Sequence, residues 1–223
     1  MKTIESPQKS SATSMLAARV SLIGAAAFLL LLGSLHFLKP DLDPSWHMIS
    51  EYAIGPFGWI MQIAFLCMAA ACAVLIVALF SQARGVVGRI GLVVLVFAAA
   101  GMVIAGINVT DPTGTSIAAM SGHGIMHAWG FQIGVPSLTS GLTLLTISLR
   151  RRVKASVRAA LLWSTVTAWL SLVALGVVFA VLLPAHQGVI ESGVVIGWPN
   201  RIYMVACAFW IIAVAWNTLQ VKK

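Results

Sequence analysis

The chain has 223 residues, of which 60% are hydrophobic and 9% are charged, and its formal net charge is +8. With a mean hydropathy of +0.97, this composition excludes a soluble globular domain and is typical of a polytopic membrane protein. The positive charge does not indicate nucleic-acid binding, because the basic residues are divided among short loops between apolar stretches.

Six apolar stretches predict an all-α integral membrane protein, a bundle of six transmembrane helices. A polar tail over residues 1–15 comes first, residues 16–220 form the membrane domain, and residues 221–223 form a second tail. The chain is too short to hold a separate soluble domain as well. The predicted spans cover residues 15–37, 56–80, 90–109, 122–149, 159–183 and 201–220.

The connection after the first span, residues 39–55, is the most polar segment between spans. Asp43 followed by Pro44 is typical of a helix N-cap with proline at the first helical position. Gly55 and Pro56 are strong helix terminators. The sequence therefore predicts a short helix over residues 44–53 in this loop.

The charges are sorted between the two ends of the predicted spans. Of the 14 Lys and Arg residues, 12 lie at one set of ends, whereas all five His and five of the six carboxylates lie at the other. Because basic loops face the cytoplasm, both termini are predicted to be cytoplasmic, in a multi-pass protein of the cytoplasmic membrane with the short helix in its first outer loop. The basic loops are expected to contact anionic lipid headgroups of the bilayer. Nothing in the sequence indicates an oligomeric state.

His123 and His127 form the first candidate site. They are four residues apart, which places both imidazoles on one face of a helix, one turn apart, as in a metal chelate. Zinc or another divalent metal needs three or four donors, and His47 or His186 is the expected third ligand. Two alternatives stay open: a proton relay or pH sensor, and hydrogen-bonded helix packing.

The carboxylates and one arginine supply the remaining candidates. Glu51 and Asp111 are candidate catalytic groups beside a metal-bound water, although either could simply brace a helix or a turn. Ser50 and Arg201 are candidate binding groups for a substrate or an anion, since arginine recognises phosphate and carboxylate groups. The alternative for Arg201 is a buried ion pair with Glu51, Asp111 or Glu191.

These motifs resemble those of a known family. They are Ile49-Ser50-Glu51-Tyr52 after an Asp-Pro loop, Asp111-Pro112 before the fourth span, His123-Gly124 through His127, and Arg201 at the start of the last span. The chain resembles, over residues 16–220, a prokaryotic six-helix integral membrane family catalogued as domain of unknown function number nine hundred and ninety-eight. Members usually have Gln where this chain has Asn200. The resemblance implies six helices and an outward polar cluster, and it implies no reaction.

The sequence thus predicts an outward-facing polar pocket built by five residues: Glu51, Asp111, His123, His127 and Arg201. The first hypothesis is a metal-dependent hydrolase of a lipid or amphiphile. The alternatives are a proton-coupled transporter or sensor and a non-catalytic membrane scaffold. The sequence does not decide whether the protein is an enzyme.

Overall fold

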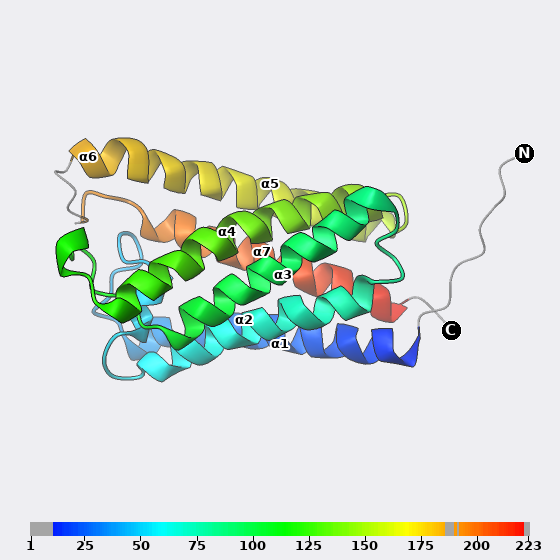
Figure 1. The fold of residues 1–223 in the computed structure, drawn as a ribbon, viewed down its shortest axis with the longest axis horizontal. Helices are drawn as coiled ribbons and strands as arrows, with labels where there is room; N and C mark the ends of the chain where they lie inside the picture. The colour runs from blue at the N-terminus through cyan, green and yellow to red at the C-terminus, as the bar shows by residue number, and fades with distance from the viewer. Residues whose placement is uncertain (1–10, 186–189, 191, 221–223) are drawn as a thin grey trace, which may run out of the picture.

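Six long helices make up most of the chain (Figure 1). The computed structural model describes residues 11–185, 190 and 192–220. The long helices are α1 (Ala12–Leu38), α2 (Gly58–Leu79), α3 (Gly85–Ile107), α4 (Gly122–Leu149), α5 (Ala155–Val177) and α7 (Gly197–Gln220). The shorter elements are two 3-10 turns, η1 (Ile49–Ala53) and η2 (Ile117–Ala119), the π-helical turn η3 (Val178–Leu182), and α6 (Leu183–Ala185).

The described chain contains six helices that are long and apolar enough to cross a membrane, with α5, η3 and α6 forming one stretch, Ala155–Ala185. The prediction of an all-helical chain with six such helices is therefore confirmed. α3 and α5 begin at Gly85 and Ala155, ahead of the predicted spans. Their first turns hold Arg89 and Arg158, whose long side chains suit a position just beyond an apolar stretch.

Within the loop predicted to hold a short helix, the helical residues are the five of η1. Before η1, a carboxylate oxygen of Asp43 accepts hydrogen bonds from the Ser45 main-chain nitrogen (2.8 Å) and hydroxyl (2.7 Å). These two hydrogen bonds lower the pKa of Asp43. The carboxylate therefore stabilises a turn at Ser45, a role that Asp side chains commonly have in loops.

The two ends of the bundle differ in character (Figure 1). The α2–α3 and α4–α5 connections lie at one end, together with the start of α1 and the end of α7. We call it the basic end, because Arg84, Arg150 to Arg152 and Lys154 lie there. The opposite end, which holds residues 39–57 and 108–121, is the polar end. Both ends of the described chain thus lie at the basic end.

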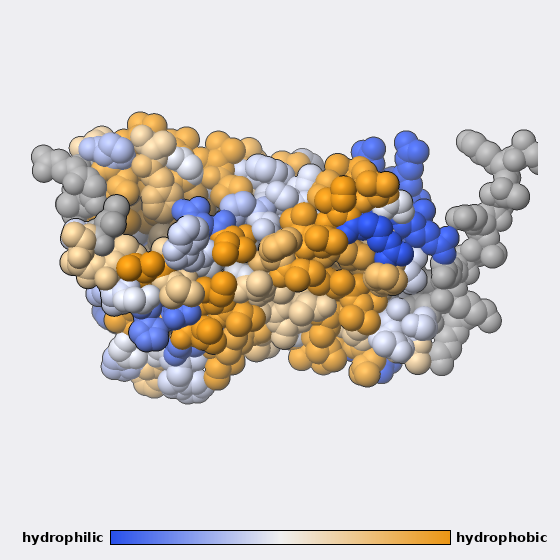
Figure 2. All heavy atoms as spheres, viewed as in Figure 1, coloured by the Kyte–Doolittle hydropathy of each residue, from blue (hydrophilic) through white to orange (hydrophobic). Residues whose placement is uncertain are grey.

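Between these two ends, the outer surface of the bundle is largely apolar. Figure 2 shows hydrophobic atoms over the middle of one face and the most hydrophilic atoms gathered at the basic end. Large apolar side chains are exposed on every long helix, among them Leu30, Val93 and Leu170. A soluble monomer rarely exposes so much contiguous apolar surface, so this surface suits a hydrocarbon environment.

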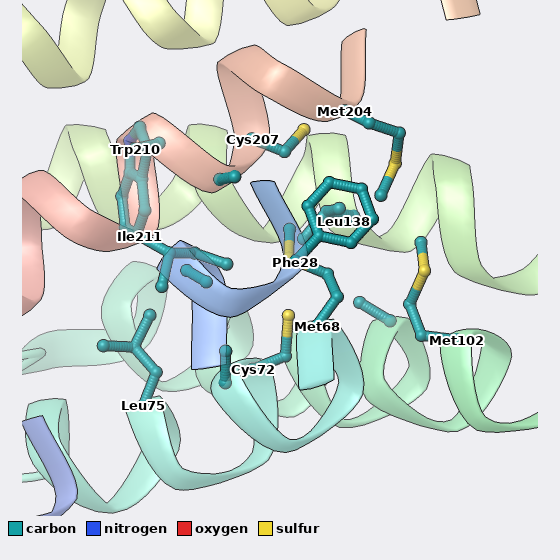
Figure 3. Close-up of a cluster of buried hydrophobic side chains, with 14 of the residues drawn as sticks. Phe28, Met68, Cys72, Leu75, Met102, Leu138, Met204, Cys207, Trp210 and Ile211 are labelled. Carbon is teal, nitrogen blue, oxygen red and sulfur yellow. The ribbon is translucent and has the colours of Figure 1, made fainter. Parts of the chain in front are cut away.

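α7 supplies much of the interior. Figure 3 shows Met204, Cys207, Trp210 and Ile211 of α7 pointing into a core shared with α1, α2, α3 and α4. Buried hydrogen bonds join the helices within this core. The hydroxyls of Thr139 and Tyr203 lie 2.9 Å apart, and the Trp210 indole donates to Thr146 at 2.8 Å. Side-chain hydrogen bonds of this kind help to fix neighbouring helices in a membrane.

Glycines set the distance between α3 and α4. A Cβ atom on Gly101 would lie 2.4 Å from the Cα of Gly134 and 2.7 Å from the carbonyl oxygen of Gly130. Both contacts are with main-chain atoms, which cannot turn aside as a flexible side chain can. Residues without side chains let two membrane helices approach this closely, and α4 carries His123 and His127 at the polar end.

We expect Gly101→Ala to destabilise the bundle, because α3 and α4 must separate to admit the methyl group. Overpacking of this kind costs about 1–3 kcal/mol. Unfolding in detergent, followed by circular dichroism, measures the loss. The matched control is Gly176→Ala in α5, where an added Cβ meets nothing within 4 Å. Equal stability of the two variants would show that the close crossing is not required.

Candidate functional site

Arg201, in the first turn of α7, is the most heavily bonded side chain of the polar end, and it is only 4% exposed. Its Nε donates to His36 Nε2 of α1 and its Nη2 donates to the Tyr52 hydroxyl of η1, each at 3.0 Å. Its Nη1 donates to three main-chain carbonyl oxygens, those of Pro44 (3.1 Å), His47 (2.5 Å) and Gly197 (3.2 Å). One guanidinium therefore holds α1, the first connection and η1 onto α7.

Neighbouring contacts complete this attachment. The main-chain nitrogen of Gly197 donates to the Ser45 carbonyl at 2.9 Å, and a Cβ on Gly197 would lie 2.3 Å from the Pro44 carbonyl oxygen. The Asn200 side-chain carbonyl accepts from the main-chain nitrogen of Ile49 at 3.0 Å. The first connection is thus fixed along its length to the start of α7.

Lys39 binds the part of the first connection at the end of η1. Its ammonium donates to the main-chain carbonyls of Tyr52 (3.2 Å) and Ile54. Burial lowers the pKa of Lys39, because removal from water disfavours the charged form. The ammonium group caps the carbonyls at the end of η1, so this basic residue of the polar end is a structural brace.

Glu51 links η1 to the connection between α3 and α4. One carboxylate oxygen contacts Nδ1 of His47, and the other accepts from the Thr113 hydroxyl and, at 3.4 Å, from the main-chain nitrogen of Met48. The His47–Glu51 contact is an ion pair when the imidazole is protonated. One of the two candidates for the third metal ligand and one of the two candidate catalytic groups are therefore bonded to each other.

Asp111 braces the start of α4. Its Oδ2 accepts from the main-chain nitrogen of Ser121 at 2.8 Å, and the Ser121 hydroxyl caps α4 by accepting from the Gly124 main-chain nitrogen at 3.0 Å. A Cβ on Gly124 would lie 1.9 Å from the Asp111 carboxylate. The glycine between the two predicted histidine ligands is thus needed for the approach of this carboxylate.

His123 and His127 both meet Asn108 at the end of α3, but they differ in burial. His123 is exposed, and its Nδ1 lies 3.0 Å from the side-chain oxygen of Asn108. His127 is 6% exposed, and its Nδ1 lies 2.8 Å from the main-chain oxygen of Asn108 and 3.1 Å from that of Ala105. Carbonyl oxygens can only accept, so Nδ1 of His127 carries a hydrogen, and in the neutral imidazole Nε2 then keeps its lone pair.

The ring of His127 borders a small cavity of about 30 Å³ between α2, α3, α4, α7 and η1. Ser50 and Asn200, each only 5% exposed, line it as well. Three polar groups here have no hydrogen-bond partner among the described residues: the Ser50 hydroxyl, Nε2 of His127 and the Asn200 side-chain nitrogen. The cavity has room for a water molecule or an ion, and buried polar groups normally have a partner.

In the described part of the chain, the five residues predicted to build one pocket do not bond directly to one another: Arg201 and Glu51 are linked only through His47, His123 and His127 share Asn108, and Asp111 bonds to the start of α4. Arg201 bonds to His36 and Tyr52, and Glu51 bonds to His47. Among the described residues, no group of three His, Cys, Asp or Glu side chains is placed to hold a metal ion. His186 and Glu191 lie outside the described residues. The zinc ligands and the catalytic groups named from the sequence therefore stay predictions.

Several residues of the polar end that bond to predicted site residues were not themselves predicted as site residues, although Tyr52 belongs to one of the quoted motifs. His36, Tyr52, Asn108 and Thr113 bond directly to predicted site residues. Asn200 was noted only as the neighbour of Arg201. It lies one helical turn from Met204, a spacing that puts both side chains on one face of α7, and both line the cavity.

We expect Arg201→Lys to loosen the first connection, because an ammonium cannot reproduce the planar fork of five donors. With hydrogen bonds to a charged group contributing about 1.5–3 kcal/mol each, the loss of unfolding free energy should reach about 2 kcal/mol or more. Thermal unfolding in detergent and cleavage within residues 39–57 by limited proteolysis measure the effect. Arg158→Lys, at an exposed position of α5, is the control, and the same midpoint and cleavage rate for both variants would contradict the role assigned to Arg201.

No curated protein and no solved structure matches the chain. One family model, described as "Protein of unknown function (DUF998)", matches residues 22–217. The match begins within α1 and ends within α7, so it includes α2 to α5 completely and most of α1 and α7. The resemblance drawn from the motifs is thereby confirmed, and the chain belongs to the DUF998 family of membrane proteins.

Proposed function

We propose that the protein is a metal-binding membrane protein, and that Nε2 of His127 is the group that anchors the ion. One observation carries this proposal. The His127 ring is buried and borders a cavity, its Nδ1 donates to two main-chain carbonyls, and its Nε2 has no hydrogen-bond partner among the described residues. Histidines that bind metals have this arrangement, with the second nitrogen donating to a carbonyl or carboxylate that fixes the tautomer and the ring orientation.

The energetics favour an occupant in this cavity. A buried polar group that loses its water partner without gaining another costs about 1–3 kcal/mol, and three such groups share the space beside His127. A water molecule could satisfy some of them. A metal ion satisfies a bare imidazole nitrogen more strongly, since neutral imidazole is the commonest metal ligand in proteins.

The geometry gives less support to the metal-dependent hydrolase predicted from the sequence. That mechanism needs Glu51 or Asp111 beside the metal-bound water, whereas Glu51 bonds to His47 and Asp111 bonds to the start of α4. It also needs a free guanidinium for an anionic substrate, and Arg201 donates to main-chain carbonyls. Metal binding without an assigned reaction is therefore the proposal that the site supports best.

A proton-coupled transporter also receives less support. Next to the cavity, the hydroxyl of Tyr203 is buried and donates to the main-chain carbonyl of Val135 at 2.7 Å, and Thr139 lies within hydrogen-bond distance of it. Val135 itself lines the cavity. Packed side chains thus separate the cavity from the basic end, which favours a binding site over a path through the bundle.

We also infer an orientation and a membrane contact. The rule that basic loops face the cytoplasm places the basic end and both termini inside the cell, and the cavity in the outer half of the cytoplasmic membrane. The basic residues from Arg150 to Lys154 then lie near the inner leaflet, where anionic lipid headgroups attract them. This orientation would give the cavity access to ions from outside the cell.

We expect the purified protein to retain one equivalent of metal after loading and desalting, and we expect His127→Ala to lose it. Elemental analysis after separate exposure to zinc and to monovalent copper under reducing conditions measures both. His123→Ala is the matched comparison, because the two imidazoles share Asn108 but only His127 borders the cavity. We expect His123→Ala to keep the metal. Wild-type protein that retains no metal, or His127→Ala protein that retains as much as the wild type, would refute the proposal.

A further inference from the structure

The lining of the His127 cavity contains three methionines, which come from three different parts of the fold. Met48 directly precedes η1, Met102 lies on α3 and Met204 lies on α7. His127 adds a fourth donor from α4. Figure 3 shows the side chains of Met102 and Met204 extending from opposite helices toward the same region of the core.

These methionines differ from others in the core. Met61 and Met68 are also fully buried, yet neither lines this cavity. Met102 and Met204 are 4% and 2% exposed, and Met48 is half-buried and lies outside the membrane-spanning helices. Three methionines and His127 therefore line one cavity near the polar end.

The donors that line this cavity are soft and uncharged. Thioether sulfur is a ligand of monovalent copper, whereas zinc and harder ions prefer imidazole, thiolate and carboxylate donors. Among the described residues that line the cavity, none carries a carboxylate or a thiol. Because charge is costly to bury without a counter-charge, a site of neutral donors favours an ion with one positive charge over an ion with two.

Resting on the metal binding proposed above, we propose that this cavity is a site for a soft monovalent cation, Cu⁺ or its analogue Ag⁺. Nε2 of His127 and the sulfur atoms of Met48, Met102 and Met204 are its ligands. The two carbonyls that accept from Nδ1 hold the imidazole in place for the ion. The proposal replaces the divalent ion expected from the histidine spacing with a monovalent one.

The test is a titration of the purified protein in detergent with Ag⁺, which needs no reductant. All variants carry Cys67→Ala, since Cys67 is the one free thiol that is not fully buried and thiols also bind Ag⁺. Met102→Leu and Met204→Leu remove one sulfur each with little change in volume. Met61→Leu and Met68→Leu make the same change at buried positions away from the cavity.

We expect one equivalent of Ag⁺ to bind, with affinity lowered about tenfold or more by Met102→Leu or Met204→Leu and unchanged by Met61→Leu or Met68→Leu. NMR of protein labelled with ¹³C at the methionine methyl groups gives a second readout. It is measured on protein that keeps all of its methionines, so it does not depend on the folding of a methionine variant. Ag⁺ should shift the methyl signals of Met48, Met102 and Met204 and leave those of Met61 and Met68 in place.

The possible outcomes distinguish the soft-cation site from the more general proposal of metal binding at His127. If zinc binds in a manner that depends on His127 while Ag⁺ does not bind, or binds equally to the Met102→Leu/Met204→Leu double variant, the soft-cation site is refuted and metal binding at His127 stands. If neither ion binds to the wild type, or if His127→Ala retains both ions, the two proposals fail together. Methyl shifts confined to Met61 and Met68 would also overturn the assignment.

Discussion

The polar end of this protein depends on one guanidinium. Arg201 reaches from the first turn of α7 to His36 of α1, to Tyr52 of η1 and to the main-chain carbonyls of the first connection. A buried arginine is costly unless its donors are paired, and here carbonyl and ring acceptors pair it. This interaction fixes η1 against α7, and the fixed η1 brings Ser50 and the adjacent Met48 to the wall of the cavity.

The same constraint explains why most titratable side chains of the polar end have structural roles. Polar groups in an apolar surrounding must find partners within the protein. Glu51 joins η1 to Thr113, Asp111 joins the α3–α4 connection to Ser121, and Lys39 caps η1. Among the described residues of the polar end, these bonds leave polar groups without a partner at the His127 cavity, so binding is expected there and not at the carboxylates.

The sequence predicts the fold better than the site, for physical reasons. Six spans follow from the length and apolarity of each stretch, and the shared face of His123 and His127 follows from helical geometry. The hydrogen-bond partners of Arg201 cannot be predicted from the sequence, because most of them are main-chain carbonyl oxygens, which every residue has. That Met102 and Met204 line one cavity depends on how α3 and α7 are arranged around α2 and α4, and a lone methionine in an apolar span indicates only a core position.

The hydrogen bonds of the polar end leave Nε2 of His127 without a partner among the described residues. The tautomer of His127 tests this point most directly. Nitrogen-15 NMR of histidine-labelled protein in detergent at neutral pH reports which ring nitrogen carries hydrogen, and the His127→Asn spectrum identifies the signals. The structure predicts a protonated Nδ1 that donates to the carbonyls of Ala105 and Asn108, and an unprotonated Nε2. A hydrogen on Nε2 and a bare Nδ1 would contradict the account.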